Sequence, residues 1–247
     1  MELARYLDAT YLKLPVIGGL SEAEAKSEVI KLIKDAISFG FKLVMIRPAH
    51  IALARQLIDK VNSEVLVGTV IGFHEGTYPI ASKLEEAQIA IDAGADELDF
   101  VLNYTAFKDG NIALVTQEIL KGTAIALNNN KVVKWIIEVA ALSNREIAEI
   151  SSLIKNVVIT TFGVDQAERV FVKSSTGFFI TSQGKPNGAT LEAIKIMHKH
   201  ASPLRIKAAG GVKTKEDALK MITLGVQRIG TSSAKEIILG EAHNFDY

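Results

Sequence analysis

The stretch LRIKAAGGVKTKEDALKMITLGVQRIGTSSA, residues 204–234, contains one strand–helix unit and the strand of the next. An apolar run over 204–208 ends in small residues, and Thr214 then opens a helix whose apolar residues recur every three or four positions. Gly225 ends this helix, and a second short strand follows over 227–230. Such alternation of short β-rich runs with longer helical patterns is typical of a parallel α/β fold.

The same alternation continues along the rest of the chain. Further strands are predicted at 6–9, 42–46, 65–71, 97–102, 132–139 and 170–174. The clearest helix, at 21–39, begins with Ser21 and Glu24 at the spacing of a capping box and ends before Gly40. About eight strand–helix units in 247 residues predict a (β/α)8 TIM barrel. A doubly wound sheet seldom needs so many units, and no GxGxxG motif follows the first strand.

Composition narrows the class of protein. No stretch has the length and the Pro, Gly or Ser content of a linker, so residues 1–247 are predicted to form one domain. The 28 Lys and Arg residues balance 28 Asp and Glu residues, which argues against a nucleic-acid or membrane-surface partner. The absence of Cys excludes disulfides, thiol catalysis and Cys-ligated zinc. The segment 1–10 carries charge where a signal peptide is apolar, so we expect a cytoplasmic protein.

Charged residues interrupt several apolar strands close to their ends. They are Asp99, Lys134, Glu138, Lys173 and Lys207. The active site of a (β/α)8 barrel lies at the carboxyl ends of its strands. Burying one such charge without a partner costs several kcal/mol, so a set of them at strand ends favours a functional site over chance.

Two lysines on neighbouring late strands have a specific chemical use. An exposed lysine has a pKa of about 10.4, so its amine is almost wholly protonated and a poor nucleophile. Burial and a neighbouring ammonium both disfavour the charged form. One lysine of the pair Lys173 and Lys207 can therefore become a neutral amine that attacks a carbonyl to form a Schiff base. Asp99 is a candidate for moving protons in the same site.

The loops after the last two predicted strands indicate a phosphate site. AAGGV (208–212) and GTSSA (230–234) consist of small residues that let backbone amides approach an anion, and Ser232 and Ser233 add hydroxyl donors. Barrels bind phosphate at this position. STG (175–177) is expected to supply further amides. The histidines lack metal-ligand spacing, so we expect no metal, which disfavours a zinc-dependent aldolase.

Six stretches, in order along nearly the whole chain, match one family. They are LDATYLK (7–13), VGTVIGFHEGTYPIASKLEEAQIAIDAGADELDFVLNYTAFKDG (67–110), VVKWIIEVAAL (132–142), FVKSSTGF (171–178), IKAAGGVKT (206–214) and IGTSSA (229–234). With these motifs the chain resembles the deoxyribose-phosphate aldolases, which are class I aldolases. FVKSSTGF followed by IKAAGG is the specific part of the resemblance, whereas GADELD alone is not.

The resemblance implies a (β/α)8 barrel without metal or organic cofactor. It implies reversible cleavage of 2-deoxy-D-ribose 5-phosphate to acetaldehyde and D-glyceraldehyde 3-phosphate, as in deoxyribonucleotide catabolism. It implies Lys173 as the Schiff-base lysine, Lys207 as the lysine that perturbs it, and Asp99 as the acid/base partner. The implied phosphate-binding positions are Gly177, Gly210, Gly211, Lys213, Gly230, Ser232 and Ser233, and the supporting polar positions are Asp8, Thr10 and Lys134. A homodimer or other homo-oligomer is also expected.

Some positions depart from the family pattern. Met45 stands where many members carry Cys. Segments 156–169 and 178–190 are longer than usual, and both are expected as loops near the substrate entrance. Arg47 has no explanation from the sequence, and the terminal Tyr247 is either inert or a proton shuttle that folds over the site.

Two alternatives remain open at the level of sequence. The first is another lysine-dependent or phosphate-binding barrel enzyme, such as a transaldolase-like, fructose-bisphosphate-type or isomerase activity. A screen of donor substrates separates this alternative from a deoxyribose-phosphate aldolase. The second is a non-catalytic barrel that binds a sugar phosphate without turnover. The retained Lys173, Lys207 and Asp99 argue against a non-catalytic barrel.

Overall fold

The computed structural model describes residues 2–15, 19–182 and 185–241. In these ranges, eight parallel strands pair in chain order and β8 pairs with β1, so the sheet closes. The strands are β1 (Leu7–Tyr11), β2 (Leu43–Ile46), β3 (Leu66–Ile71), β4 (Glu97–Val101), β5 (Val132–Ile136), β6 (Val170–Lys173), β7 (Arg205–Ala209) and β8 (Arg228–Thr231). The predicted (β/α)8 barrel is confirmed.

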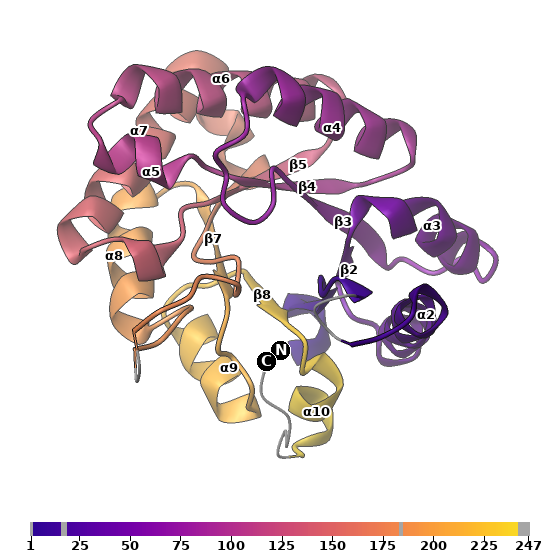
Figure 1. The fold of residues 1–247 in the computed structure, drawn as a ribbon. Helices are drawn as coiled ribbons and strands as arrows, with labels where there is room; N and C mark the ends of the chain where they lie inside the picture. The colour runs from indigo at the N-terminus through magenta and orange to yellow at the C-terminus, as the bar shows by residue number, and fades with distance from the viewer. Residues whose placement is uncertain (1, 16–18, 183–184, 242–247) are drawn as a thin grey trace.

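The helices form an outer ring around the strands (Figure 1). They are α2 (Glu22–Phe39), α3 (Ile51–Asp59), α4 (Ile80–Asp92), α5 (Tyr104–Lys108), α6 (Ile112–Asn128), α7 (Asn144–Phe162), α8 (Leu191–Ala201), α9 (Lys215–Thr223) and α10 (Ala234–Leu239). Short 3₁₀ helices lie at η1 (Leu3–Tyr6), η2 (Pro48–His50), η3 (Val139–Ala141) and η4 (Val164–Arg169). Within the described part of the chain, no helix has the length and apolar character needed to cross a membrane.

The strands bury both faces because each pleat points alternate side chains inward and outward. In β2, Val44 and Ile46 belong to the main core between the sheet and the helices. Leu43 and Met45 point the other way and form a small separate cluster with Val70. This cluster fills one side of the barrel interior, and charged side chains occupy much of the rest.

The local signals predicted for α2 are present. Ser21 accepts a hydrogen bond from the backbone amide of Glu24, whose carboxylate in turn accepts from Ser21, so the capping box is complete. Val29 and Ile33 on the predicted apolar face are fully buried. Gly40 ends the helix with a φ of +66°, a left-handed conformation that suits glycine.

Two boundaries differ from the sequence expectation. β5 ends at Ile136 rather than at 139, and Glu138 has a φ of +55°, which turns the chain out of the strand into η3. The segment 156–169 is not a loop at the substrate entrance. It forms the last turns of α7 and then η4, which leads directly into the first residue of β6 and therefore lies at the opposite, amino end of the strands. The helical periodicity of α7 runs through the segment that was expected to be an insertion.

Candidate active site

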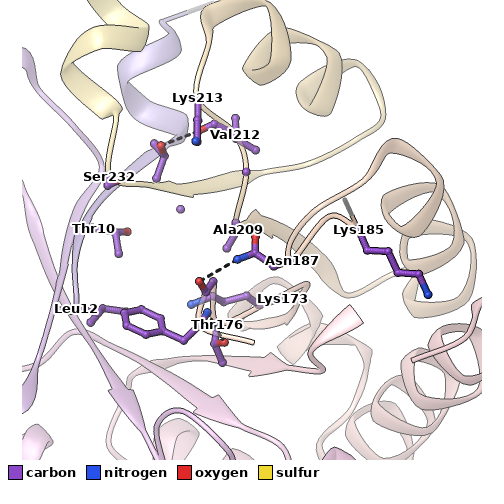
Figure 2. A pocket seen from close by; sticks show the side chains of 16 residues that line it. Thr10, Leu12, Lys173, Thr176, Lys185, Asn187, Ala209, Val212, Lys213 and Ser232 are labelled. Carbon is purple, nitrogen blue, oxygen red and sulfur yellow. Dashed lines mark hydrogen bonds between the residues drawn. The ribbon is translucent and has the colours of Figure 1, made fainter. Parts of the chain in front are cut away.

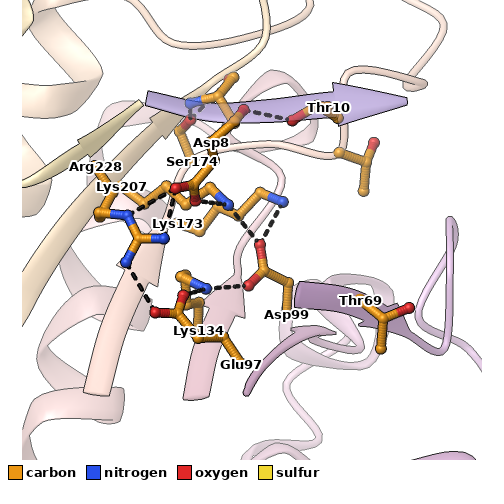
Figure 3. Close-up of polar contacts among 12 residues, drawn as sticks. Asp8, Thr10, Thr69, Glu97, Asp99, Lys134, Lys173, Ser174, Lys207 and Arg228 are labelled. Atoms are coloured by element: carbon orange, nitrogen blue, oxygen red, sulfur yellow. Dashed lines mark hydrogen bonds and ion pairs between the residues drawn. The ribbon is translucent and has the colours of Figure 1, made fainter. Parts of the chain in front are cut away.

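Charged side chains from six strands, β1 and β4 to β8, converge inside the barrel (Figure 3). Asp99 on β4 lies at their centre. Its Oδ1 is 2.7 Å from the Lys134 Nζ, and its Oδ2 is 2.8 Å from the Lys173 Nζ and 2.9 Å from the Lys207 Nζ. Strand pairing produces this convergence, because Asp99 aligns with Lys134 across β4 and β5, and Lys173 with Lys207 across β6 and β7. The structure thus brings together the three residues that the sequence singled out for chemistry.

The pKa values of Asp99 and Lys173 are shifted in the directions that this crowding predicts. Burial alone would raise the pKa of Asp99, but the ammonium groups of Lys134, Lys173 and Lys207 hold it well below its ordinary value. The pKa of Lys173 is lowered to about 8: burial is the largest cause, Asp99 opposes it, and the ammonium groups of Lys207 and Lys134 add to the lowering. The larger of the two causes that the sequence suggested is therefore burial, with the neighbouring ammonium second.

A cavity of about 630 Å³ opens above this cluster (Figure 2). Lys173 is one of its lining residues, so the amine with the lowered pKa is accessible from the cavity. Asp8, Asp99, Lys134 and Lys207 are fully buried and are not among the lining residues. Of the remaining predicted site residues, the lining includes Thr10, Gly177, Gly210, Gly211, Lys213, Gly230 and Ser232.

Ser233 differs from its predicted place. Its side chain is 1% exposed, it is not part of the cavity lining, and its Oγ has no hydrogen-bond partner among the described residues. Its backbone amide bonds to the Thr231 Oγ1 at 3.0 Å, so the residue helps to shape the turn before α10. Ser232 lines the cavity, whereas Ser233 lies behind its wall.

Glycine stands at these positions of the cavity wall for two different structural reasons. Gly177, Gly210 and Gly211 have φ values of +82°, +83° and +81°, a conformation that favours glycine. Gly230 instead makes room, because a Cβ there would lie 3.1 Å from the Cε of Lys207. A side chain at 230 would therefore press on the buried lysine.

A metal site is not among the features of this cavity. Among the residues that the structure describes, no group of three or more His, Cys, Asp or Glu side chains is placed to hold a metal ion. Tyr247, the candidate proton shuttle, lies outside the described residues.

Comparison with known proteins agrees with the geometry. The model of the DeoC/LacD family aldolases matches residues 15–238. The chain belongs to this aldolase family. The protein named deoxyribose-phosphate aldolase from Thermococcus kodakarensis is 38% identical over 240 residues, which cover 97% of this chain and 96% of that protein.

Solved structures of relatives have the same fold. A putative deoxyribose-phosphate aldolase from Coccidioides immitis superposes with a TM-score of 0.81 at 32% identity, covering 96% of this chain and 85% of that one. A deoxyribose phosphate aldolase from Aeropyrum pernix, described as a unique tetrameric structure, has a TM-score of 0.77 at 28% identity, covering 96% and 89%.

Glu138 was predicted as a charged residue near the end of a strand, but no function could be inferred for it from the sequence. It lies just beyond β5, 1% exposed, and its Oε2 accepts hydrogen bonds from the backbone amide of Thr176 at 3.1 Å and from the Thr176 Oγ1 at 2.5 Å. The Thr176 hydroxyl in turn accepts from the amide of Phe178. Glu138 therefore holds the turn that contains Gly177, and burial raises its pKa. The left-handed backbone conformation of Glu138, which ends the strand early, could not be predicted from the sequence.

Arg47, which the sequence left unexplained, supports one wall of the same cavity. Its Nε donates a hydrogen bond of 2.8 Å to the carbonyl oxygen of Leu12, and its guanidinium lies 4.5 Å from the centre of the Phe73 ring. Phe73 packs edge-on against Phe178 with ring centres 5.1 Å apart. Leu12 and Phe178 both line the cavity, so Arg47 and Phe73 support an apolar part of its wall from behind.

Proposed function

We propose that this protein catalyses the reversible cleavage of 2-deoxy-D-ribose 5-phosphate to acetaldehyde and D-glyceraldehyde 3-phosphate through a Schiff base on Lys173. The observation that carries the proposal is the position of Lys173: it lines the cavity, and its pKa is lowered to about 8. The names of the curated relatives support the same substrate. At pH 7 roughly one amine in ten is then neutral, against roughly one in 2,500 at an ordinary lysine pKa.

The reaction follows from a neutral amine beside a carboxylate. The Lys173 Nζ attacks the aldehyde carbon C1 of the open-chain sugar, and loss of water leaves a protonated imine. A base removes the proton of the C3 hydroxyl, the C2–C3 bond breaks, and its electron pair moves toward the imine nitrogen. Glyceraldehyde 3-phosphate leaves, C2 of the remaining enamine takes up a proton, and water releases acetaldehyde and the amine.

Asp99 has a role behind the reacting atoms. It accepts hydrogen bonds from both Lys173 and Lys207 through its Oδ2, so a proton can pass between the two amines through one oxygen. Lys134 and Asp8 support this arrangement from the far side: Lys134 contacts the Asp99 Oδ1, and the Asp8 Oδ2 lies 2.6 Å from the Lys207 Nζ. We assign Thr10, on the cavity wall, to a contact with the sugar.

The phosphate would lie against the glycine turns. Small residues at 177 and 210–211 expose backbone amides to the cavity, and Lys213 and Ser232 line it beside them. Lys185 and Asn187 contribute a further part of this wall. The next residue, Gly188, packs against Gly210 so closely that a Cβ would lie 2.3 Å from its carbonyl oxygen. Ala189 donates to the Ala209 and Gly210 carbonyl oxygens and keeps this segment in place.

Borohydride trapping tests the proposal. Incubation with 2-deoxyribose 5-phosphate or acetaldehyde and then borohydride should leave a stable adduct on Lys173, located by intact mass and peptide mapping. Lys173→Ala should abolish it. Lys185→Ala is the matched control, because Lys185 also lines the cavity but extends away from the other lining side chains (Figure 2). An adduct on another lysine would contradict the assignment, and turnover of dihydroxyacetone phosphate in place of acetaldehyde would contradict the substrate.

We further propose a homo-oligomer that works in the cytoplasm on small aldehydes and sugar phosphates, without a cofactor. The tetramer described for the Aeropyrum pernix protein supports the oligomer. Light scattering on the purified protein should give a mass of at least twice 26.7 kDa, and a monomer would contradict this part of the proposal.

A further inference from the structure

Six buried charged side chains form a closed circuit inside the barrel (Figure 3). Carboxylates and cations alternate around it in the order Asp8, Lys207, Asp99, Lys134, Glu97 and Arg228, and Arg228 returns to Asp8. We call this set the ionic ring. Each member is at most 5% exposed.

Every link of the ionic ring is a direct contact. Arg228 closes the ring by contacting both Asp8 and Glu97. The Arg228 Nε is 2.7 Å from the Asp8 Oδ1, and the Arg228 Nη1 is 2.9 Å from the Glu97 Oε1. The Glu97 Oε2 then lies 2.5 Å from the Lys134 Nζ. That last contact, like the one between Asp8 Oδ2 and Lys207, has the distance of an ion pair without hydrogen-bond angles, so charge attraction is its main component. The ring therefore depends on the charge of each member.

The ionic ring is balanced by itself, with three carboxylates and three cations. Lys173 is a seventh group that contacts the ring only through the Asp99 Oδ2. The charged groups that act on Lys173 are Asp99 on β4, Lys134 on β5, Lys207 on β7 and, beyond the end of β5, Glu138. Relative to the ionic ring alone, a protonated Lys173 adds one positive charge, whereas a neutral Lys173 leaves the balance of the ring unchanged.

The members farthest from the substrate are fixed in their charged forms. Burial alone would raise the pKa of Glu97, but Lys134 and Arg228 lower it to about 2. Burial acts against the charge of Arg228, but Asp8 and Glu97 raise its pKa above the ordinary arginine value. Neither Glu97 nor Arg228 lines the cavity.

We propose that Glu97 and Arg228 are positioning residues for the aldolase reaction, which complete the ionic ring and thereby fix the charge balance against which Lys173 loses its proton. The inference rests on the proposed function, because it takes Lys173 as the nucleophile. Neither residue touches the substrate. They act through charge balance. Arg228 is the third cation, which together with Lys134 and Lys207 balances the three carboxylates of the ring.

Opposite charge changes at Glu97 and Arg228 give opposite results. Glu97→Gln removes a negative charge, so the ring is left positive and Lys173 loses its proton at lower pH. Arg228→Met removes a positive charge and keeps an unbranched side chain, so the ring is left negative and Lys173 keeps its proton to higher pH. The double variant Glu97→Gln with Arg228→Met restores neutrality. A purely structural role would weaken both single variants without moving them in opposite directions.

The measurement is the pH dependence of the single-turnover rate at which borohydride traps acetaldehyde on Lys173. We expect the midpoint to move down in Glu97→Gln and up in Arg228→Met, each by ~0.5–1 pH unit, and to stay near that of the parent protein in the double variant. Arg228→Lys, which keeps the charge, should also retain the parent midpoint.

The outcomes separate this inference from the proposed function. Midpoints that coincide, or that shift in one direction in both single variants, would overturn the role of the ring while leaving Lys173 as nucleophile. If a single variant does not fold, the double variant and Arg228→Lys still decide, because a displaced midpoint in either contradicts charge balance. Absence of any adduct in the parent protein would instead overturn the proposed function.

Discussion

At the scale of single residues, the chemistry depends on the environment of one amine. Lys173 has a folded-state pKa of about 8, below the ordinary value of about 10.4. The unfolded chain therefore binds more protons than the folded chain between these two pH values, and the contribution of Lys173 to stability rises with pH across that window. Below pH 8 the folded protein holds a buried ammonium, which lowers its stability. The same burial makes Lys173 a nucleophile near neutral pH.

Replacement of Lys207 tests the like-charge part of this argument. In Lys207→Leu the neighbouring ammonium is lost and the Asp99 Oδ2 is left with Lys173 as its ammonium partner. Both changes favour a protonated Lys173, so the midpoint of the pH–rate profile should move from about 8 to higher pH, and the rate at pH 7 should fall. Lys185→Leu serves as the control. An unmoved midpoint would show that burial alone sets the reactivity of Lys173.

Replacement of Glu138 tests whether the turn at Gly177 binds phosphate, as we propose. In Glu138→Gln the two bonds from Thr176 lose their charge-assisted character. Each such loss weakens a hydrogen bond by roughly 1 kcal/mol, so the turn at Gly177 should loosen. We expect a several-fold rise of KM for 2-deoxyribose 5-phosphate and little change for unphosphorylated 2-deoxyribose. Equal losses for both sugars would place the effect of Glu138 elsewhere than at the phosphate.

At the scale of elements, side chains near the helix ends determine where several helices of the barrel begin. The N-cap side chains Ser21 and Ser143 complete capping boxes at α2 and α7, and Thr190 and Thr214 cap α8 and α9. These caps satisfy amides that a helix cannot satisfy internally. These four helices therefore begin at fixed residues, which helps the strands that follow to keep their register.

The cap of α2 makes this argument measurable. Ser21→Ala removes the acceptor for the Glu24 amide and should lower the free energy of unfolding by about 1 kcal/mol. Ser27→Ala is a matched control on the same helix, because its hydroxyl donates to the Ala23 carbonyl oxygen inside the helix and caps nothing. Chemical unfolding of both variants decides, and equal stabilities would mean that α2 is held by packing alone.

At the scale of the whole molecule, the barrel encloses a polar interior that solvent does not screen. The chain as a whole has no net charge, and the buried ionic ring is balanced as well. Buried pairs are expensive to desolvate, so such a set is a poor means of stabilisation. The presence of the ionic ring inside the barrel is therefore better explained by its effect on the protonation of Lys173 than by a contribution to the stability of the fold.

A chelator should leave the activity unchanged, because the proposed electron sink is an imine on Lys173. Dialysis against EDTA followed by the cleavage assay checks this expectation, with a rate within experimental error of the untreated protein. Loss of activity that zinc restores would point to a metal-dependent reaction and contradict the proposed function.

The repeating strand–helix pattern, the helix caps at Ser21 and Thr214, and the strand-end positions of Asp99, Lys173 and Lys207 could all be predicted from the sequence. These features are local, and parallel strands carry their carboxyl ends to one rim of a barrel, so the site could be expected from them. The expectation for 156–169 was wrong because a continuous helical pattern in α7 was interpreted as an insertion.

Only the tertiary structure decided which charges meet. Arg228 contacts Asp8 across 220 residues of sequence and Glu97 across 131, because closure of the sheet places β8 beside β1. Within one strand Glu97 and Arg228 are indistinguishable from surface charges. Their pairing, like the turn that Glu138 holds, depends on distances between elements that no local pattern encodes, since side-chain contacts form only after the barrel has closed.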